Sequence, residues 1–185
     1  MEGTEQIRLV PANTKERLRQ VRSLYLKAFP LRERKPFALI LHKVKQEQME
    51  VFAIENEAGE FLGEVITILY RDILLLDYFA VVPECRRMGI GRQALEAVLS
   101  RAKERRVLLE IETTKNASDN KEERIRRKKF YLKSGMTAMD YSVNLFGVEM
   151  ELMTYRCEVS FKEYHALFRD LFGEAAAKHV RLIEK

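Results

Sequence analysis

Apolar residues recur along the chain with the two spacings typical of strands and of helices. Ile7 to Val10 are predicted to form a short strand, and Asn13 or Thr14 can cap a helix that runs to about Phe29. Pro30 ends this helix, and a second one is predicted from Pro36, since proline suits a first helical turn. A charged connector, Leu31 to Lys35, separates the two helices.

Three strands with tight turns are predicted next, as an antiparallel meander. They cover Val51 to Ile54, Phe61 to Tyr70 and Ile73 to Val82. The third is almost continuously apolar, as expected for a strand covered on both faces, and Asp77 is the exception inside it.

Helices and strands then alternate through the rest of the chain. The predicted segments are a helix from Gly89 to Arg105, a strand from Val107 to Thr113, a polar loop from Lys115 to Asn120, a basic helix from Glu122 to Ser134, strands at Ala138 to Leu145 and Val148 to Cys157, and an amphipathic helix from Ser160 to Phe172. This order predicts an α/β (α+β) fold. The apolar stripe of the last helix favours core packing over a homodimer interface.

Composition indicates one globular domain, residues 1–185, with a helical extension at about 160–185. The chain is 46% apolar and 33% charged. It has no apolar run of membrane-spanning length, and acids stand in Met1 to Leu9 where a signal peptide would be basic and then apolar, so we expect a cytoplasmic location and no membrane partner. The two cysteines and three histidines are scattered, which predicts no metal site.

A net charge of +5 and a pI near 9.2 favour anionic partners, either a phosphorylated cofactor or nucleic acid. The densest basic run is Arg124, Arg126, Arg127, Lys128 and Lys129. Such a run is usually a solvated helix face, and no aromatic residues interleave it as on a base-stacking platform. Because the run lacks such aromatic residues, nucleic acid is the less favoured partner.

The strongest chemical signal is an apolar strand that breaks into a basic, glycine-containing loop and then opens a helix. The loop is Arg86-Arg87-Met88-Gly89-Ile90-Gly91-Arg92. Backbone amides at a helix start converge on an anion, the glycines permit close approach, and guanidinium groups add full positive charge. This pattern predicts a phosphate-binding site.

Two other kinds of phosphate loop fit less well. No GxxxxGK run is present, which excludes a Walker A loop. The run from Gly89 to Ala94 satisfies the GxGxxG/A dinucleotide pattern, and Glu110 and Glu112 follow at about the expected spacing. However, a Rossmann glycine follows its strand almost at once, whereas Pro83 to Met88 intervene here, and no second nucleotide-binding half follows.

The same residues resemble the GNAT superfamily of N-acetyltransferases, whose Q/R-x-x-G-x-G/A motif is met by Arg86 to Gly91. The resemblance implies a mixed, mostly antiparallel central sheet of about seven strands with helices on both faces. It also implies that acetyl-coenzyme A (acetyl-CoA) is the cofactor, with its pyrophosphate on the backbone amides of residues 87–92. The edge of the strand Phe79, Ala80 and Val81 would pair with the pantetheine arm.

A second family element supports the resemblance. Phe130-Tyr131-Leu132-Lys133-Ser134-Gly135-Met136 is similar to the family's F-Y-x-x-x-G-F. In the family the tyrosine commonly protonates the departing thiolate, so the resemblance makes Tyr131 the candidate general acid. The alternative is an ordinary tyrosine that packs its helix on the sheet.

Three acids are candidates for the general base. Asp77 lies in the apolar strand, where burial would raise the pKa of its carboxyl, and Glu110 and Glu112 lie on the next strand. The alternative for all three is a solvated or salt-bridged carboxylate, for instance one paired with Arg126 or Arg127.

One departure from the family pattern concerns the residues before Tyr131. Many members have Asn seven residues and Ala four residues earlier, where this chain has Arg124 and Arg127, so the asparagine's cofactor contacts do not carry over. A bacterial-type branch of the family is resembled by two further patterns: Glu110-x-Glu112 followed by Arg126-Arg127-x-x-Phe130-Tyr131, and the early Phe29-Pro30-x-Arg32-Glu33-Arg34-x-Pro36-Phe37.

The resemblance implies an enzyme that moves acetyl from acetyl-CoA to a primary amine by direct attack. The acceptor is a small molecule or a peptide that the sequence does not identify. The alternative is a catalytically silent coenzyme A binding module that acts as a regulatory or interaction protein.

Overall fold

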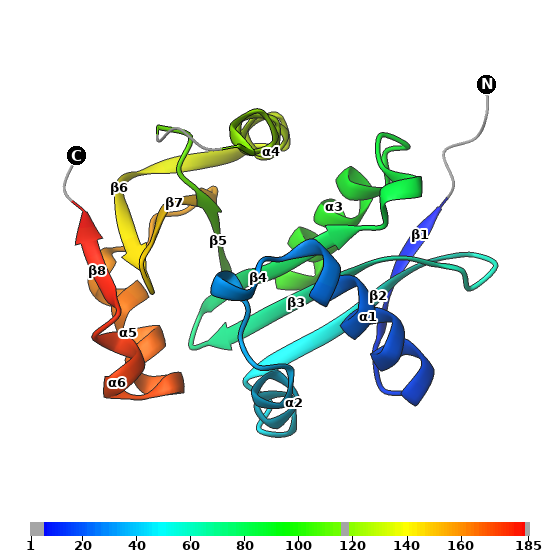
Figure 1. Ribbon diagram of the computed structural model, residues 1–185, viewed down its shortest axis with the longest axis horizontal. Coiled ribbons are helices and arrows are strands. Elements are labelled where there is room, and N and C mark those ends of the chain that lie inside the picture. Colours follow the sequence, from blue (N-terminus) through cyan, green and yellow to red (C-terminus); the bar gives the residue numbers. More distant parts are fainter. Residues whose placement is uncertain (1–5, 116–118, 184–185) are drawn as a thin grey trace. The chain divides into compact units, whose positions relative to one another are not determined.

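The computed structural model describes residues 6–115 and 119–183, so residues 1–5 and residues 116–118 of the predicted polar loop lie outside it. The described residues form a mixed α/β fold with one eight-stranded sheet, in the order β1-β2-β3-β4-β5-β7-β6-β8 (Figure 1). Two compact units divide the chain. One contains the residues up to Leu69 and Leu76–Glu104, and the other contains Tyr70–Leu75 and the residues from Arg105 onward.

The first unit holds β1, β2, most of β3 and the later part of β4, with three α-helices and two short 3-10 turns. Their bounds are β1 Ile7–Pro11, α1 Lys15–Ala28, η1 Leu31–Glu33, α2 Phe37–Lys45, β2 Met49–Asn56, β3 Phe61–Tyr70, β4 Ile73–Val81, η2 Pro83–Cys85 and α3 Ile90–Ala102. Each strand and α-helix overlaps a predicted segment. The charged connector between α1 and α2 contains η1.

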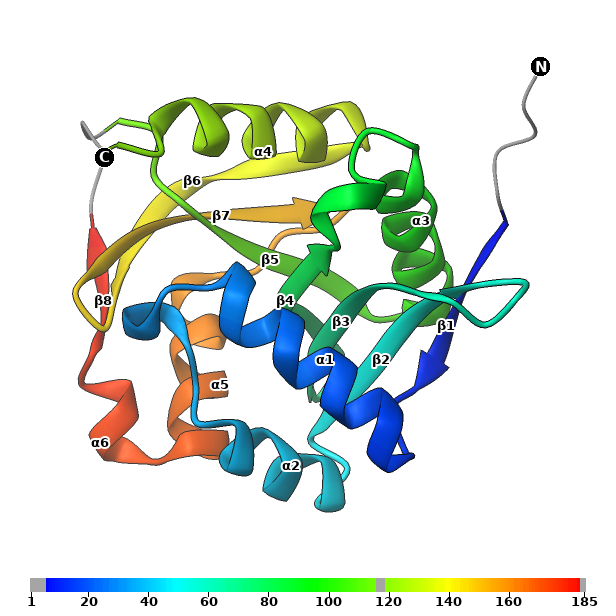
Figure 2. The same ribbon diagram turned by 45° about the vertical axis from the view of Figure 1, so that its right-hand side comes forward.

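Helices α1 and α3 cover opposite faces of β2 (Figures 1 and 2). Arg17 of α1 binds Glu55 with an Nε to Oε1 distance of 2.5 Å, whereas Arg101 of α3 binds Glu50 at 2.5 Å and lies over the ring of Phe52. Successive strand side chains point to opposite faces, so odd-numbered residues of β2 face α1 and even-numbered residues face α3. Both faces of β2 are therefore covered, and β4, the strand predicted to be covered on both faces, is buried over Ile73 to Leu76.

The second unit continues the sheet with antiparallel strands. Its elements are β5 Arg106–Glu112, α4 Lys121–Lys133, β6 Met136–Leu145, β7 Val148–Tyr155, α5 Phe161–Phe172, α6 Glu174–Ala177 and β8 Val180–Ile183. Strand β8 makes eight strands rather than about seven. It pairs with β6 inside the extension that we expected to be helical throughout.

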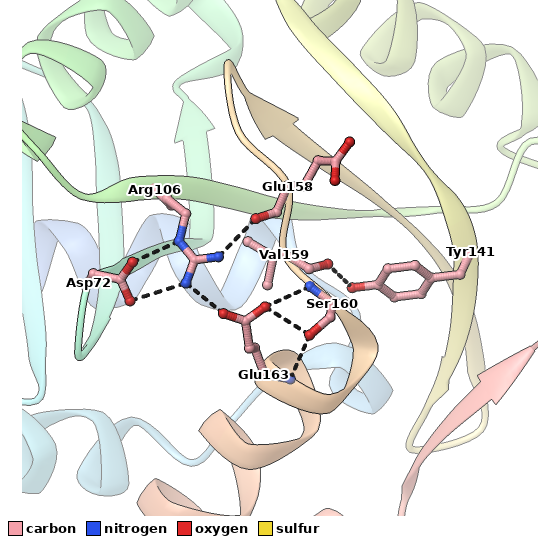
Figure 3. Close-up of polar contacts among 7 residues, drawn as sticks. All are labelled: Asp72, Arg106, Tyr141, Glu158, Val159, Ser160 and Glu163. Atoms are coloured by element: carbon pink, nitrogen blue, oxygen red, sulfur yellow. Dashed lines mark hydrogen bonds and ion pairs between the residues drawn. The ribbon is translucent and has the colours of Figure 1, made fainter.

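Arg106 at the start of β5 fixes the beginning of α5 (Figure 3). Its guanidinium donates to Asp72 at 2.7 and 3.1 Å, to the carbonyl of Glu158 at 2.9 Å and to Glu163 at 2.7 Å. Glu163 also completes a capping box with Ser160. Arg106 and the Ser160 hydrogen bonds together lower the pKa of Glu163 to about 2.

The apolar stripe of α5 is buried within the chain, in agreement with the core-packing interpretation. The buried residues are Tyr164, Leu167, Phe168 and Leu171. None of the helices in the described part of the chain combines the length and hydrophobicity that a membrane span needs.

Candidate active site

The basic loop after β4 has the backbone conformation of an anion site. Strand β4 ends at Val81, η2 follows, and Gly89 precedes the first residue of α3 with a φ of 83°. Arg87 also has a positive φ, 70°, and Ile90 is buried and anchors the helix start. Left-handed residues in such a turn direct successive backbone N–H groups into one concavity.

The amides of this loop are available to a ligand. Within residues 6–115 and 119–183, the backbone N–H groups of residues 89–92 have no backbone acceptor, and Gln93 is the first residue of the helix start to bond, to the carbonyl of Gly89 at 3.1 Å. The first turn of a helix has no internal acceptors for its N–H groups, and the helix dipole adds partial positive charge there.

Three guanidinium groups surround these amides. Arg86, Arg87 and Arg92 are all exposed. Arg86 Nε donates to the carbonyl of Val81 at 3.3 Å, which holds this side chain at the end of β4, and Arg92 pairs with Glu96 on the surface of α3. The loop therefore presents fixed backbone dipoles together with exposed positive charge.

The strand segment before the loop lies tightly against β3. A Cβ atom added to Gly63 would lie 2.4 Å from the carbonyl oxygen of Ala80 and 3.1 Å from the Cα atom of Val81. Phe79, Ala80 and Val81 themselves are only partly buried. Glycine at position 63 thus permits a backbone approach that any side chain would prevent.

Asp77 is a buried carboxylate on β4, two residues before Phe79. Its side chain is 2% exposed, and Lys35 Nζ lies 2.7 Å from Oδ1 and 3.0 Å from Oδ2. Burial raises the pKa of Asp77, and the Lys35 ammonium opposes that rise. The loop, the segment Phe79 to Val81 and Asp77 belong to one compact unit.

Tyr131 belongs to the second unit, near the end of α4. The ring is buried, and burial raises the pKa of its phenol to about 12, while Arg127 acts in the opposite direction. The hydroxyl has no hydrogen-bond partner among the described residues. Gly135 follows the C-cap residue of α4 with a φ of 85°, a left-handed conformation that glycine adopts at helix ends without strain.

Glu110 and Glu112, also in the second unit, contact different helices. Tyr164 of α5 donates its hydroxyl to Glu110 at 2.5 Å. Arg124 of α4 donates Nη2 to Glu112 at 2.6 Å, and both of these side chains are nearly inaccessible to solvent. The ion pair found for Glu112 among the described residues is with Arg124, rather than with Arg126 or Arg127, the examples named from the sequence.

Glu64 was not among the predicted site residues. It lies in the middle of β3, its exposed fraction is 0%, and neither carboxyl oxygen has a hydrogen-bond partner among the described residues. Burial alone raises its pKa to about 9. The available signal was an acid inside a mostly apolar strand, which is the same signal that singled out Asp77.

The basic run of α4 is partly used inside its own unit. Arg124 binds Glu112, Lys128 binds Glu151 of β7, and Arg127 lies 3.7 Å from Glu123 on the same helix. Arg126 and Lys129 remain exposed. The run is therefore not a continuous solvated face, which weakens the nucleic-acid interpretation further.

A protein-family model described as Acetyltransferase (GNAT) family matches residues 18–135, more than half of the chain. The chain belongs to this family. The match spans both motifs that suggested the resemblance, the loop at Arg86 to Gly91 and the segment from Phe130 to Gly135. Among curated proteins, none matches this chain in sequence.

Solved structures share the GNAT fold with this chain. A GNAT-family protein from Bacteroides thetaiotaomicron has a TM-score of 0.73 and 19% identity, covering 93% of this chain and 98% of its own. Spermidine N-acetyltransferase from Vibrio cholerae, solved with CoA and spermine, has a TM-score of 0.62 at 14% identity, with 80% and 94% covered. The ribosomal-protein-S18-alanine N-acetyltransferase of Escherichia coli has a TM-score of 0.61 at 17% identity, with 84% and 96% covered.

The residues of this GNAT chain fit the phosphate end of the family's cofactor. The positive φ angles of Arg87 and Gly89 shape the concavity, and the amides of residues 89–92, which have no backbone acceptor among the described residues, supply donors. A pyrophosphate needs several converging donors and compensating charge, and this loop provides both.

Proposed function

We propose that this chain transfers an acetyl group from acetyl-CoA to a primary amine. The proposal rests on three features that follow one another along β4 and the loop after it, within one compact unit. They are the buried carboxylate of Asp77, the partly buried strand segment Phe79 to Val81, and the basic loop of residues 86–92. Bound acetyl-CoA supplies a thioester whose carbonyl carbon accepts an amine nucleophile. Each feature corresponds to one requirement of that chemistry.

Residues 87–92 hold the pyrophosphate through their amides, and the exposed arginines of the loop add charge. The backbone of Phe79 to Val81 takes the pantetheine arm as an added strand, since main-chain hydrogen bonds can bind an extended ligand along a strand. Gly63 lets β3 support this segment from behind without a side chain between the two backbones.

Asp77 is our choice of general base. It is buried, which raises the pKa of its carboxyl toward a range useful for proton acceptance, and it already contacts an ammonium group. Glu110 and Glu112 stay candidates from the sequence, but their hydrogen bonds to Tyr164 and Arg124 favour structural roles in the second unit.

Tyr131 is the proposed general acid, on the basis of the family motif. A phenol whose pKa lies near 12 remains protonated across the physiological range, so the proton-donating form is the populated one. Its hydroxyl has no competing acceptor among the described residues.

One observation favours the second candidate, a CoA-binding module without transfer to an external acceptor. The proposed base is occupied by an internal cation, since Lys35 binds both oxygens of Asp77. An external amine would have to displace that ammonium or use another base.

Two measurements test the proposal. Acetyl-CoA should raise the melting temperature of the protein and NAD should not, because a ligand stabilises the state that binds it. Stabilisation by NAD alone would instead support the dinucleotide interpretation.

An acceptor screen should then detect thiol release with polyamines, aminoglycosides, amino acids or N-terminal peptides. Polyamines and an N-terminal alanine are included because relatives of the same fold are named for them. Binding of acetyl-CoA without release on any amine would favour the silent module.

A further inference from the structure

Lys35 is held rigidly over β4 by its main chain as well as by its side chain. Its backbone N–H donates to the hydroxyl of Tyr78 at 2.9 Å, and its carbonyl accepts from the hydroxyl of Tyr25 at 2.8 Å. Tyr78 in turn donates to the carbonyl of Glu33 at 2.9 Å. The connector between α1 and α2 is thus anchored on both sides of Lys35.

The side chain of Lys35 points inward from this anchor. It is 18% exposed, and its ammonium contacts both oxygens of a carboxylate that is 2% exposed. Removing an ammonium group from most of its water is costly unless it is paired. The fold therefore places one primary amine against the acid that we propose as the base.

The position of this pair relative to the cofactor path rests on the proposed function. The phosphate loop follows the end of β4, so an arm that pairs with the strand runs from Val81 back toward Phe79. Asp77 is two residues further in the same direction, about 7 Å at the rise of a strand. The acyl end of the arm is thereby directed toward Asp77 and Lys35.

We propose that Lys35 is itself an acceptor, acetylated on Nζ by the site of its own chain. The carboxylate of Asp77 takes one proton from the ammonium, and the free amine forms an N–C bond with the acetyl carbonyl carbon. The C–S bond breaks as the nitrogen of the adduct loses its second proton, and the departing thiolate takes up that proton. The balance is one acetyl-CoA and one lysine ammonium consumed, with one acetyl-lysine, one CoA thiol and one proton formed, the last passing from Asp77 to solvent.

Acetylation would change the contact that motivates the proposal. The amide product carries no charge, so Asp77 loses its cation while the hydrogen bonds of Tyr25 and Tyr78 to the connector remain. Modification of Lys35 would therefore remove the ion pair with Asp77 but keep the connector in place. The carboxylate of Asp77 would then have no ammonium group of Lys35 beside it.

The decisive experiment is acetyl-CoA incubation of the full chain, followed by intact mass and peptide mapping. Chemical acetylation without a site favours exposed lysines, of which Lys27 and Lys45 are matched examples on α1 and α2. We expect initial labelling at Lys35 to exceed that at Lys27 and Lys45 by at least about tenfold, because a positioned nucleophile reacts much faster than a freely diffusing one. Equal or slower labelling at Lys35 would overturn the inference.

Substitutions can distinguish the nucleophilic amine of Lys35 from its positive charge. Lys35→Arg keeps a cation beside Asp77 but removes the nucleophilic amine, so the single fast acetylation should vanish, whereas Lys27→Arg should leave it intact. A second readout needs no transfer by the protein: CoA without an acetyl group should change the labelling rate of Lys35 by acetic anhydride and leave that of Lys27 unchanged. An unchanged Lys35 rate with bound CoA would place the amine away from the cofactor and contradict the inference.

Failure of the inference differs from failure of the proposed function. If acetyl-CoA binds and an added amine is acetylated while Lys35 stays unmodified, the pair with Asp77 is only a structural anchor. If acetyl-CoA does not raise the melting temperature at all, the proposed function falls and the inference falls with it.

Discussion

Glu112 and Arg124 form a buried ion pair between the end of β5 and the first turn of α4, with a distance of 2.6 Å from Oε1 to Nη2. Arg124 also donates Nη1 to the carbonyl of Thr113 at 3.3 Å. Arg124 and Tyr131 are seven residues apart, which places both on one face of the helix. The pair therefore anchors the helix face that carries the proposed general acid.

Removing one partner of this pair should destabilise the protein strongly, because the other charge would remain buried without compensation. We expect Arg124→Met to lower the free energy of unfolding by about 3–5 kcal/mol in urea titrations. Arg127→Met, which removes a more exposed pair on the same helix, should cost no more than about 1 kcal/mol. If both variants lose similarly little free energy of unfolding, then the buried carboxylate of Glu112 does not need Arg124 to compensate its charge.

Glu64 should make stability fall as the pH rises. Its folded-state pKa is about 9, above the ordinary value of 4.5 for the unfolded chain. Between these values the unfolded carboxyl is ionised and the folded one is protonated, so a higher pH favours unfolding. From pH 5 to pH 7 this one group should remove roughly 2–3 kcal/mol of stability.

Glu64→Gln should abolish that contribution, since an amide does not titrate. The measurement is the free energy of unfolding of both proteins at pH 5 and pH 7, and the predicted quantity is the change between the two pH values rather than either absolute value. Glu57→Gln, in an exposed turn, is the matched control and should keep the wild-type dependence. If Glu64→Gln also keeps it, then the carboxyl of Glu64 is ionised in the folded protein.

Most strands and helices, and the glycine-containing loop that opens α3, could be predicted because their signals are local. Apolar spacing placed the segments, and a glycine after basic residues marked the start of α3, where Gly89 has the left-handed conformation. Strand β8 could not be predicted in this way, since four residues after a short helix carry no periodicity. It forms because β6 offers it an edge.

Partners distant in sequence could not be predicted. Asp77 was singled out as an acid in an apolar strand, but its contact with Lys35 joins residues 42 positions apart. Arg126 and Arg127 were named as example partners for a salt-bridged acid, whereas the rotation of α4 about its axis turns Arg124 inward, against Glu112. The isolation of Glu64 likewise depends on what covers β3, which a strand pattern does not specify.

The phosphate loop should be sensitive to substitution at Gly89. Valine there would have to adopt a φ of 83°, which is strained for a β-branched residue, and its side chain would enter the space of the proposed pyrophosphate. We expect Gly89→Val to weaken acetyl-CoA binding by at least about tenfold by calorimetry.

Gly59→Val is the control that distinguishes the cost of backbone strain from the loss of a cofactor-binding residue. Gly59 has a nearly identical φ of 82° with nothing within 4 Å of an added Cβ, and it lies in the turn between β2 and β3. Both variants should lose a similar amount of stability, and only Gly89→Val should lose affinity. Wild-type affinity in Gly89→Val would remove the loop from the cofactor site.

Tyr131→Phe should reduce turnover without weakening cofactor binding, because the hydroxyl is required only as the C–S bond breaks. The ring stays in place, so melting temperature and acetyl-CoA affinity should match the wild type, while the rate of the chemical step falls about a hundredfold or more. Single-turnover kinetics with an established acceptor avoid masking by product release. Because the pKa of Tyr131 is about 12, its ionisation should not limit the wild-type rate below pH 10. An unchanged single-turnover rate in Tyr131→Phe would make Tyr131 a packing residue and assign the proton to another donor.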